Sequence, residues 1–424
     1  MGAGGTRENA HRPHPSPLPE GEGTPKQGTQ KRDFAPLVPS VLSFLALVWL
    51  VVLAGFVQGE EHIVTMLLDG GESAWQRLGN ETIPPEEDLA TLADLANKLA
   101  RWIPRSFWKA HAVDFPSLHM GDVMRLEGTV IFAANLEGVY RCTMILHDGS
   151  NTDIFLPRIP QAWQLDVPIQ ERAAAFSVYI KSYQNTPVFA APSIQWFPDT
   201  WIGNLGFDVG SLEQVPVSRV TAAEQNDEET NYRAFRFTDS DVEPFYGLLR
   251  AVSAAPDGSL EEEAKKLSIG VTDLFNRPHE TRGKPVLLRG TAKRIVPTPV
   301  SDSTVQSQFG IDLYYQIYLF TEQSRGNPIV VCVRSLPDGM PVGDSADFSE
   351  PMTVAAVPYK LWIYDTPEGQ HYAPILIGRS LEWHPKPMVK RQPPTSVTSF
   401  SFALFCILAV IWAACRFWVK RSFT

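Results

Sequence analysis

The stretch Gly121-Asp-Val-Met-Arg-Leu-Glu-Gly128-Thr129 decides the fold, because a later stretch repeats its spacing. Gly283-Lys-Pro-Val-Leu-Leu-Arg-Gly290-Thr291 again places two glycines seven positions apart. Further matches follow in the same order. They pair Tyr140–Pro160 with Tyr315–Pro337 (two residues longer), Tyr179–Tyr183 with Tyr359–Tyr364, Ala191-Pro192 with Ala373-Pro374, and Trp196–Pro198 with Trp383–Pro385. An ordered series of this kind indicates an internal duplication.

Each copy is predicted to contain five β-strands, because alternating and β-branched runs are broken by turn residues. In the first copy we expect strands at 122–134, 138–147, 151–157, 175–183 and 187–197. In the second we expect them at 284–296, 312–321, 327–334, 352–364 and 370–383. Closing five strands into a small barrel removes exposed sheet edges. The predicted fold is therefore mainly β with accessory helices, with five-stranded barrels at 121–198 and 283–385.

The openings Leu126-Glu-Gly-Thr-Val130 and Leu288-Arg-Gly-Thr-Ala292 resemble the first strand of an OB-fold. In that fold a glycine permits the sharp coil that lets one strand serve both halves of the barrel. The chain is also similar to uncharacterised bacterial membrane-anchored proteins with tandem OB-like modules. That resemblance implies a fold and a location, and it supplies no catalytic motif.

Helical patterns precede both predicted barrels. Within the segment 59–120, residues 84–103 place leucines at helical spacing, and acidic residues at their start suit the positive end of a helix dipole. Within the connecting segment 199–282, Ser240-Asp-Val-Glu243 has the pattern of a capping box ahead of an apolar run. The repeated unit is therefore expected to be a helix followed by a barrel.

Two uncharged apolar runs, residues 37–57 and 397–415, are long enough to cross a bilayer. We predict a transmembrane helix at 37–58 and another at 397–415, each in contact with lipid. The alternatives are a buried core helix for either run and a cleaved secretory signal for the first. Residues 1–36 contain few bulky apolar side chains and are predicted to be a disordered tail.

The lysines and arginines near the first run set the predicted orientation. Lys26, Lys31 and Arg32 precede it, whereas the next twenty residues contain only Arg77. The positive-inside rule then places the N-terminus and the tail 416–424 in the cytoplasm of a two-pass cell-membrane protein. Residues 59–396, including a linker at 386–396, would be extracytoplasmic. The chain's formal charge of -10 leaves -14 for this segment, because the two tails carry +1 and +3. Nucleic acid is therefore a poor candidate ligand.

No catalytic, cofactor-binding or metal-binding signature stands out in the sequence. The histidines of the segment 59–396 are not paired at metal-ligand spacing with cysteine or with each other. The run Asp148–Asp153 could supply oxygen ligands to calcium, but turns use the same residue types, and we interpret it as a hairpin turn. Cys142 and Cys332 are expected to be buried free thiols, with a bridge between the modules as the alternative. We therefore predict no catalytic residue, no cofactor and no metal.

Aromatic and polar side chains on two strand positions form a candidate ligand face. In the run 314–320, period-two alternation places Tyr315, Ile317 and Leu319 on one face of the strand. Tyr314, Gln316 and Tyr318 lie on the other face. OB modules bind oligonucleotides or sugars by stacking such rings on flat ligands. The alternative is that the rings pack against the preceding helix or the other barrel. The candidate residues are Tyr179, Lys181, Tyr183, Tyr314, Gln316, Tyr318, Lys360, Trp362 and Tyr364.

Three functional hypotheses follow from the sequence. The first is a non-enzymatic protein-binding or scaffold role in the cell envelope, with another envelope protein or a second copy of the chain as partner. The second is an oligosaccharide-binding module, with single-stranded nucleic acid less favoured because of the negative charge. The third is an enzyme whose site is assembled only by the fold.

Overall fold

The computed structural model describes residues 67, 71–103, 108, 118–216, 237–366, 369–385, 408, 411 and 412. The chain divides into two compact units, residues 1–384 and 385–424. Among the described residues, no helix is both long enough and apolar enough to cross a membrane. The run 37–57 and all but three residues of the run 397–415 lie outside the described residues. The predicted tails 1–36 and 416–424 lie outside them as well.

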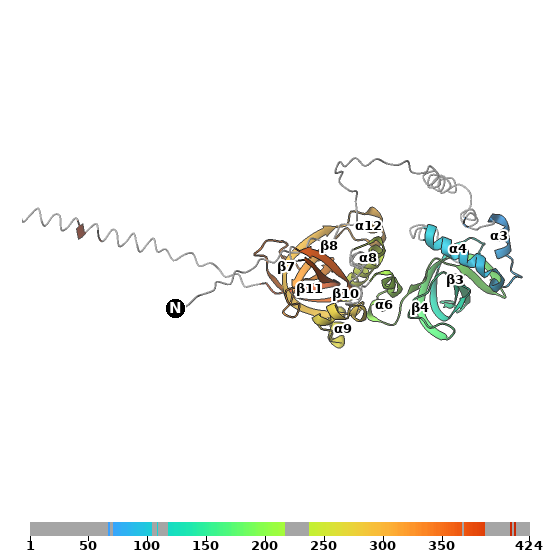
Figure 1. The fold of residues 1–424 in the computed structure, drawn as a ribbon, viewed down its shortest axis with the longest axis horizontal. Coiled ribbons are helices and arrows are strands. Elements are labelled where there is room, and N and C mark those ends of the chain that lie inside the picture. The colour runs from blue at the N-terminus through green and yellow to red at the C-terminus, as the bar shows by residue number, and fades with distance from the viewer. Residues whose placement is uncertain are drawn as a thin grey trace, which may run out of the picture. The chain divides into compact units, whose positions relative to one another are not determined.

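The N-terminal module contains a six-stranded sheet (Figure 1). Its strands lie in the order β1-β2-β3-β5-β4-β6, and β1 also pairs with β4. All pairings are antiparallel except that of β3 with β5, which is parallel. The strands are β1 (Val123–Leu136), β2 (Val139–Leu146), β3 (Asn151–Leu156), β4 (Pro168–Tyr183), β5 (Thr186–Ala190) and β6 (Gln195–Trp196).

The C-terminal module is a closed five-stranded barrel in the order β10-β11-β9-β8-β7. Strand β7 closes it by pairing with β10, and the pairing of β9 with β11 is parallel. The strands are β7 (Val286–Pro299), β8 (Leu313–Phe320), β9 (Ile329–Val333), β10 (Glu350–Thr366) and β11 (Gly369–Trp383).

The two modules share a set of strand pairings, as the predicted duplication requires. In each module the first strand pairs with the second and the fourth, and the third pairs in parallel with the fifth. Strands β5 and β6 together correspond to the single long strand β11. The closed five-stranded barrel is consistent with the OB-fold. The structure thus has one closed barrel and one six-stranded sheet, where the sequence predicted two barrels of five strands.

The repeated glycines occupy the crowded positions that the sequence predicted. A Cβ atom at Gly128 would lie 2.1 Å from the carbonyl oxygen of Ile145, and one at Gly290 would lie 2.4 Å from that of Phe320. Gly128 belongs both to the ladder with β2 and to the ladder with β4. Only a residue without a side chain fits there, so the first strand can serve both halves of its sheet.

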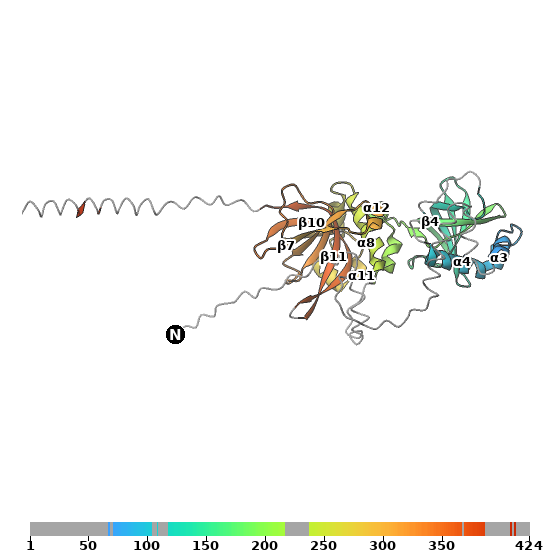
Figure 2. The same cartoon turned by 90° about the horizontal axis from the view of Figure 1, so that it is seen from above.

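Helices precede the strands of both modules, as predicted. Before β1 come α3 (Gly71–Leu78), η1 (Pro85–Asp88) and α4 (Leu89–Trp102), and α4 packs on β2, β3 and β5. The connecting segment contains α6 (Trp201–Asn204), η2 (Val209–Gln214), α8 (Asp239–Ser253), α9 (Ser259–Leu267), α10 (Val271–Asn276) and α11 (Pro278–Thr281). Helix α8 packs on β9 and β11, which correspond to β3 and β5 (Figures 1 and 2).

Each module therefore has two apolar cores, one inside the sheet and one beneath the helix. In the C-terminal module, Ile317 and Leu319 pack inside the barrel, whereas Tyr314 and Tyr318 face α8. The predicted alternation along this strand is thus confirmed, but both faces are buried. In the N-terminal module, Cys142 and Phe189 lie in the inner core, and the α4 leucines lie in the outer one.

Three details differ from the sequence predictions. The capping box of α8 is Thr238–Asp241, not Ser240–Glu243, because the Asp241 carboxylate accepts the Thr238 N–H at 2.8 Å. Strand β4 begins at Pro168, seven residues before the predicted start, since its first half pairs with β1. A short helix, α12 (Ser303–Phe309), interrupts the connection between β7 and β8.

Candidate functional site

The predicted ligand face is covered in the structure. Eight of its nine residues are buried, and only Tyr183 is partly exposed. These positions therefore do not form an open face. Tyr314, Tyr318, Trp362 and Tyr364 lie in the core beneath α8, as the packing alternative expected, whereas Tyr179 lies in the core inside the sheet of its own module. The buried residues are Tyr179, Lys181, Tyr314, Gln316, Tyr318, Lys360, Trp362 and Tyr364.

Helix α8 is the element that covers the rings of the C-terminal module. Phe245 packs edge-on against Tyr314 and Tyr359, with ring centroids 5.6 and 5.7 Å apart. Tyr246 packs edge-on against Tyr314 at 6.3 Å. Burial raises the pKa of Tyr246 to about 12 and raises that of Tyr318 further still. These phenols stay neutral and serve packing, so they do not form a stacking platform for a ligand.

A buried ion pair joins the barrel to the start of α8. Lys360 donates to both carboxylate oxygens of Asp241, at 2.9 and 3.0 Å, and the two side chains are 1% and 0% exposed. The Tyr359 hydroxyl donates to the same carboxylate at 3.0 Å. Burial lowers the pKa of Lys360, and the Asp241 carboxylate opposes that shift. The network is closed to solvent, and its geometry fixes the helix on the sheet.

Lys181 has the corresponding role in the N-terminal module. It is 2% exposed, and its Nζ donates to the carbonyl oxygens of Asn80 and Ile83 at 3.2 and 2.8 Å. Burial lowers its pKa, while the carboxylate of Asp88 raises it. In both modules, a lysine of the fourth strand therefore reaches the residues at or just before the start of the covering helix.

Backbone contacts show which residues of the fourth strands are equivalent. The N–H of Gly121 donates to the Tyr179 carbonyl, and the N–H of Gly283 donates to the Pro358 carbonyl. A β-bulge follows at once in both strands, and the lysine comes next. Lys181 is thus equivalent to Lys360, whereas the sequence comparison paired Tyr179 with Tyr359, one position out of register. The sequence comparison followed the two tyrosines, but the residue that corresponds to Tyr179 is Pro358.

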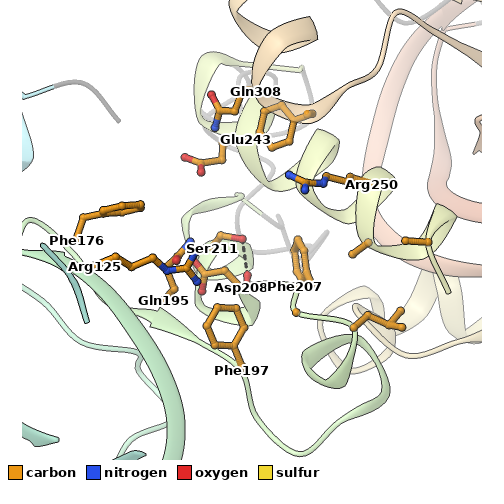
Figure 3. A pocket seen from close by; sticks show the side chains of 16 residues that line it. Arg125, Phe176, Gln195, Phe197, Phe207, Asp208, Ser211, Glu243, Arg250 and Gln308 are labelled. Atoms are coloured by element: carbon orange, nitrogen blue, oxygen red, sulfur yellow. Dashed lines mark hydrogen bonds between the residues drawn. The ribbon is translucent and has the colours of Figure 1, made fainter. Parts of the chain in front are cut away.

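A cleft of about 420 Å³ lies elsewhere, lined by β1, β4, the segment 195–211, α8 and α12. Figure 3 shows Arg125 and Phe176 on one side and Arg250 of α8 on the other. Its remaining lining residues are Gln195, Phe197, Leu205, Gly206, Phe207, Asp208, Ser211, Glu243, Gly247, Ala251, Ala254, Gln308 and Phe309. Pockets of this size that combine aromatic and polar side chains are the usual place for ligands.

Hydrogen bonds hold the segment that forms the cleft floor. The Asp208 carboxylate accepts the Trp196 N–H at 2.9 Å, and its carbonyl accepts the Ser211 hydroxyl at 2.6 Å (Figure 3). Phe207 of the same segment is buried in the core beneath α8. The segment is therefore anchored to both modules. A second cleft of about 570 Å³, which includes Arg158 and Glu213, shares Asp208 with the first.

Sequence patterns did not identify the cleft residues. Arg125 and Phe176 are directly opposite one another on β1 and β4, a register that becomes visible only when the two strands pair. Arg250 lies at the end of a helix whose predicted role was packing. Five dispersed segments line the site, and a single sequence carries no signal that would join them.

The described part of the chain contains no candidate metal-binding site. None of its histidine, cysteine and acidic residues gather in a group that could hold an ion. Cys142 and Cys332 are buried free thiols, as predicted. Burial raises the pKa of Cys142 to about 12, with a smaller contribution from Asp153. Asp148, in the run that we interpreted as a hairpin turn, accepts hydrogen bonds from the N–H and hydroxyl of Ser150.

Comparison of the chain with protein-family models and with curated protein sequences finds no match.

Proposed function

We propose that this chain is a non-enzymatic scaffold protein of the cell envelope that binds another envelope protein. Residues 37–57 and 397–415 would anchor it in the cytoplasmic membrane as a two-pass protein with both termini inside. The two modules would face the extracytoplasmic side. In this role the modules supply a rigid surface, and no reaction is required of them.

The covering of the same sheet face in both modules carries the proposal. OB modules bind sugars and single strands on the face that includes the second and third strands. Here α4 packs on β2 and β3, and α8 packs on β9 and on the β8 tyrosines. A buried lysine binds the first turn of α8 in one module and the loop that precedes η1 and α4 in the other. Because the helices occupy that face, a partner protein would bind a surface outside it, such as the cleft.

Oligosaccharide binding is a second candidate, and the cleft provides the observation that favours it. Phe176, Phe197 and Phe309 line it together with Gln195 and Gln308, a mixture of rings and amides that suits a sugar. The acidic segment 59–396 disfavours nucleic acid at the same place.

Site-specific photocrosslinking in intact cells tests the proposal. A photoreactive residue replaces Ala254, which lines the cleft, in the full-length chain, and the matched control replaces exposed Lys265 of α9. We expect a crosslinked envelope protein of one size from position 254 and none from position 265. When the photoreactive residue is instead placed in the captured protein, it should crosslink to this chain and give a product of the same size.

Failure to crosslink any envelope protein from position 254 would contradict the scaffold role. Titration of the purified chain with a panel of glycans and oligonucleotides tests the alternative. Saturable quenching of tryptophan fluorescence by one glycan would favour the sugar-binding function, whereas unchanged fluorescence across the panel would remove it.

A further inference from the structure

We propose that the cleft binds a segment of a partner polypeptide that carries a carboxylate next to an apolar side chain. The carboxylate would lie between Arg125 and Arg250, and the apolar side chain would lie against the phenylalanine rings. This inference rests on the proposed function and names the chemistry of the partner at that same site.

The duplication shows that Arg125 and Phe176 are not requirements of the fold. They form a cross-strand pair on β1 and β4, and the equivalent pair on β7 and β10 is Leu287 and Ala355. The same sheet position thus accepts leucine and alanine in one copy and an arginine–aromatic pair in the other. The Arg125 guanidinium lies 5.9 Å from the centre of the Phe176 ring. The arginine–aromatic pair lines the cleft in one copy and is absent from the equivalent strand position of the other, which points to recognition.

Arg125 remains available to a ligand. Its ion pair with Glu127 is 3.2 Å long, but the two side chains are 47% and 53% exposed. Exposed pairs of this kind contribute little and exchange readily. A carboxylate that reaches the cleft can therefore compete for the guanidinium, with the ring of Phe176 holding the arginine in place.

The opposite wall provides the second guanidinium and the space for an apolar group. Arg250 is exposed near the end of α8, and Figure 3 shows it directed toward the cleft. Gly247, one turn earlier, leaves that wall without a side chain, and a Cβ there would lie 3.5 Å from Phe207. Glycine inside a helix costs about 1 kcal/mol relative to alanine. The glycine brings the helix backbone close to Phe207 and Phe309, and both rings line the cleft, where an apolar side chain of the partner can contact them.

Charge favours a carboxylate over a neutral ligand. Guanidinium groups bind carboxylates in bidentate geometry, and such bonds are among the strongest in proteins. The cleft also contains Asp208 and Glu243, but Asp208 already accepts the Trp196 N–H. The two arginines and the two carboxylates of the lining balance in formal charge, so the guanidinium groups offer directed hydrogen-bond donors rather than a net positive field. A local site of this kind fixes register and specificity more than it adds long-range attraction.

Peptide arrays probed with the full-length chain in nanodiscs test this inference. One set of hexapeptides contains a single Asp or Glu next to Phe, Trp or Leu, and the matched set replaces the acid with Asn or Gln. We expect the acidic set to bind at least tenfold more tightly than the amide set. Arg125→Gln and Arg250→Gln should each remove most of that preference, while Lys265→Gln on α9 keeps it.

Two results would overturn the inference. The first is equal binding of the acidic and amide sets, and the second is an acid preference that survives both arginine substitutions. Circular dichroism of each variant, compared with the parent chain, shows that the fold is retained. If position 254 crosslinks an envelope protein but the arrays show no acid preference, the scaffold role stands and only this inference fails.

Discussion

Lys360 and Asp241, 119 residues apart, form a buried ion pair that fixes the first turn of α8 to strand β10. Asp241 also caps its own helix through the Thr238 N–H. One carboxylate thus defines where the helix starts and where it sits on the sheet.

Lys360→Met should destabilise the chain by about 3–5 kcal/mol, because it leaves the Asp241 carboxylate buried without its cation. Urea unfolding followed by tryptophan fluorescence measures the change. The control is Lys266→Met, which removes an exposed lysine paired with partly exposed Glu263, and its cost should stay below about 0.5 kcal/mol. A cost for Lys360→Met as small as that of the control would contradict the anchoring role of the pair.

A second repeated contact joins a tryptophan at the end of each module to a glutamate. Trp196 donates from Nε1 to Glu171, and Trp383 donates from Nε1 to Glu350, both at 2.8 Å. Glu171→Ala and Glu350→Ala should each cost about 1 kcal/mol, because a partly buried donor loses its acceptor. Exposed Glu382→Ala is the control. Unfolding measurements that show a loss at only one of the two sites would argue against equivalent modules.

We expect glycine-to-alanine substitutions to change stability in opposite directions at different positions. Gly128→Ala and Gly290→Ala should destabilise by about 1–3 kcal/mol, because the new methyl groups would meet the carbonyls of Ile145 and Phe320. Gly247→Ala should instead stabilise by about 0.5–1 kcal/mol, because a Cβ there meets only ordinary contacts within a helix. Thermal unfolding of the three variants measures both effects. Stabilisation by Gly128→Ala would show that β1 does not have the crowded register described.

Buried tyrosines predict a loss of stability at alkaline pH. Burial raises the pKa of Tyr246 from 10.0 to about 12, so the unfolded state ionises first as pH rises. This contribution is fully present below pH 10 and is lost as pH rises through about 12. The free energy of unfolding, measured in that window, should fall less steeply for Tyr246→Phe than for the parent chain. Identical slopes for the two chains would contradict burial of this phenol.

The sequence predicted the elements of the fold better than their contacts. Glycine spacing and strand alternation revealed the duplication, since both follow from local backbone sterics. The register of the fourth strands was missed by one position because the comparison matched Tyr179 with Tyr359, whereas Pro358 occupies the position that corresponds to Tyr179. The candidate face of Tyr314 and Tyr318 was correctly placed on one side of its strand. Only the three-dimensional packing of α8 shows that this side is covered.

The cleft could not be predicted for a related reason. Arg125, Phe176 and Arg250 come from three segments, and none of them belongs to a motif. Strand register shows that Leu287 and Ala355 occupy the positions in the second copy that correspond to Arg125 and Phe176. The difference between the copies is what singles out these two residues. Comparison of the copies thus separates what the fold needs from what one module alone contains.

The placement of both modules outside the cytoplasmic membrane is tested most directly by cysteine labelling in intact cells. Native Cys142 and Cys332 are buried and give little background. Ser150→Cys and Gln323→Cys place single exposed thiols in corresponding hairpins of the two modules. A membrane-impermeant maleimide, added to cells whose outer layers admit it, should label both positions without lysis. Labelling of either position only after the cytoplasmic membrane is broken would contradict the account.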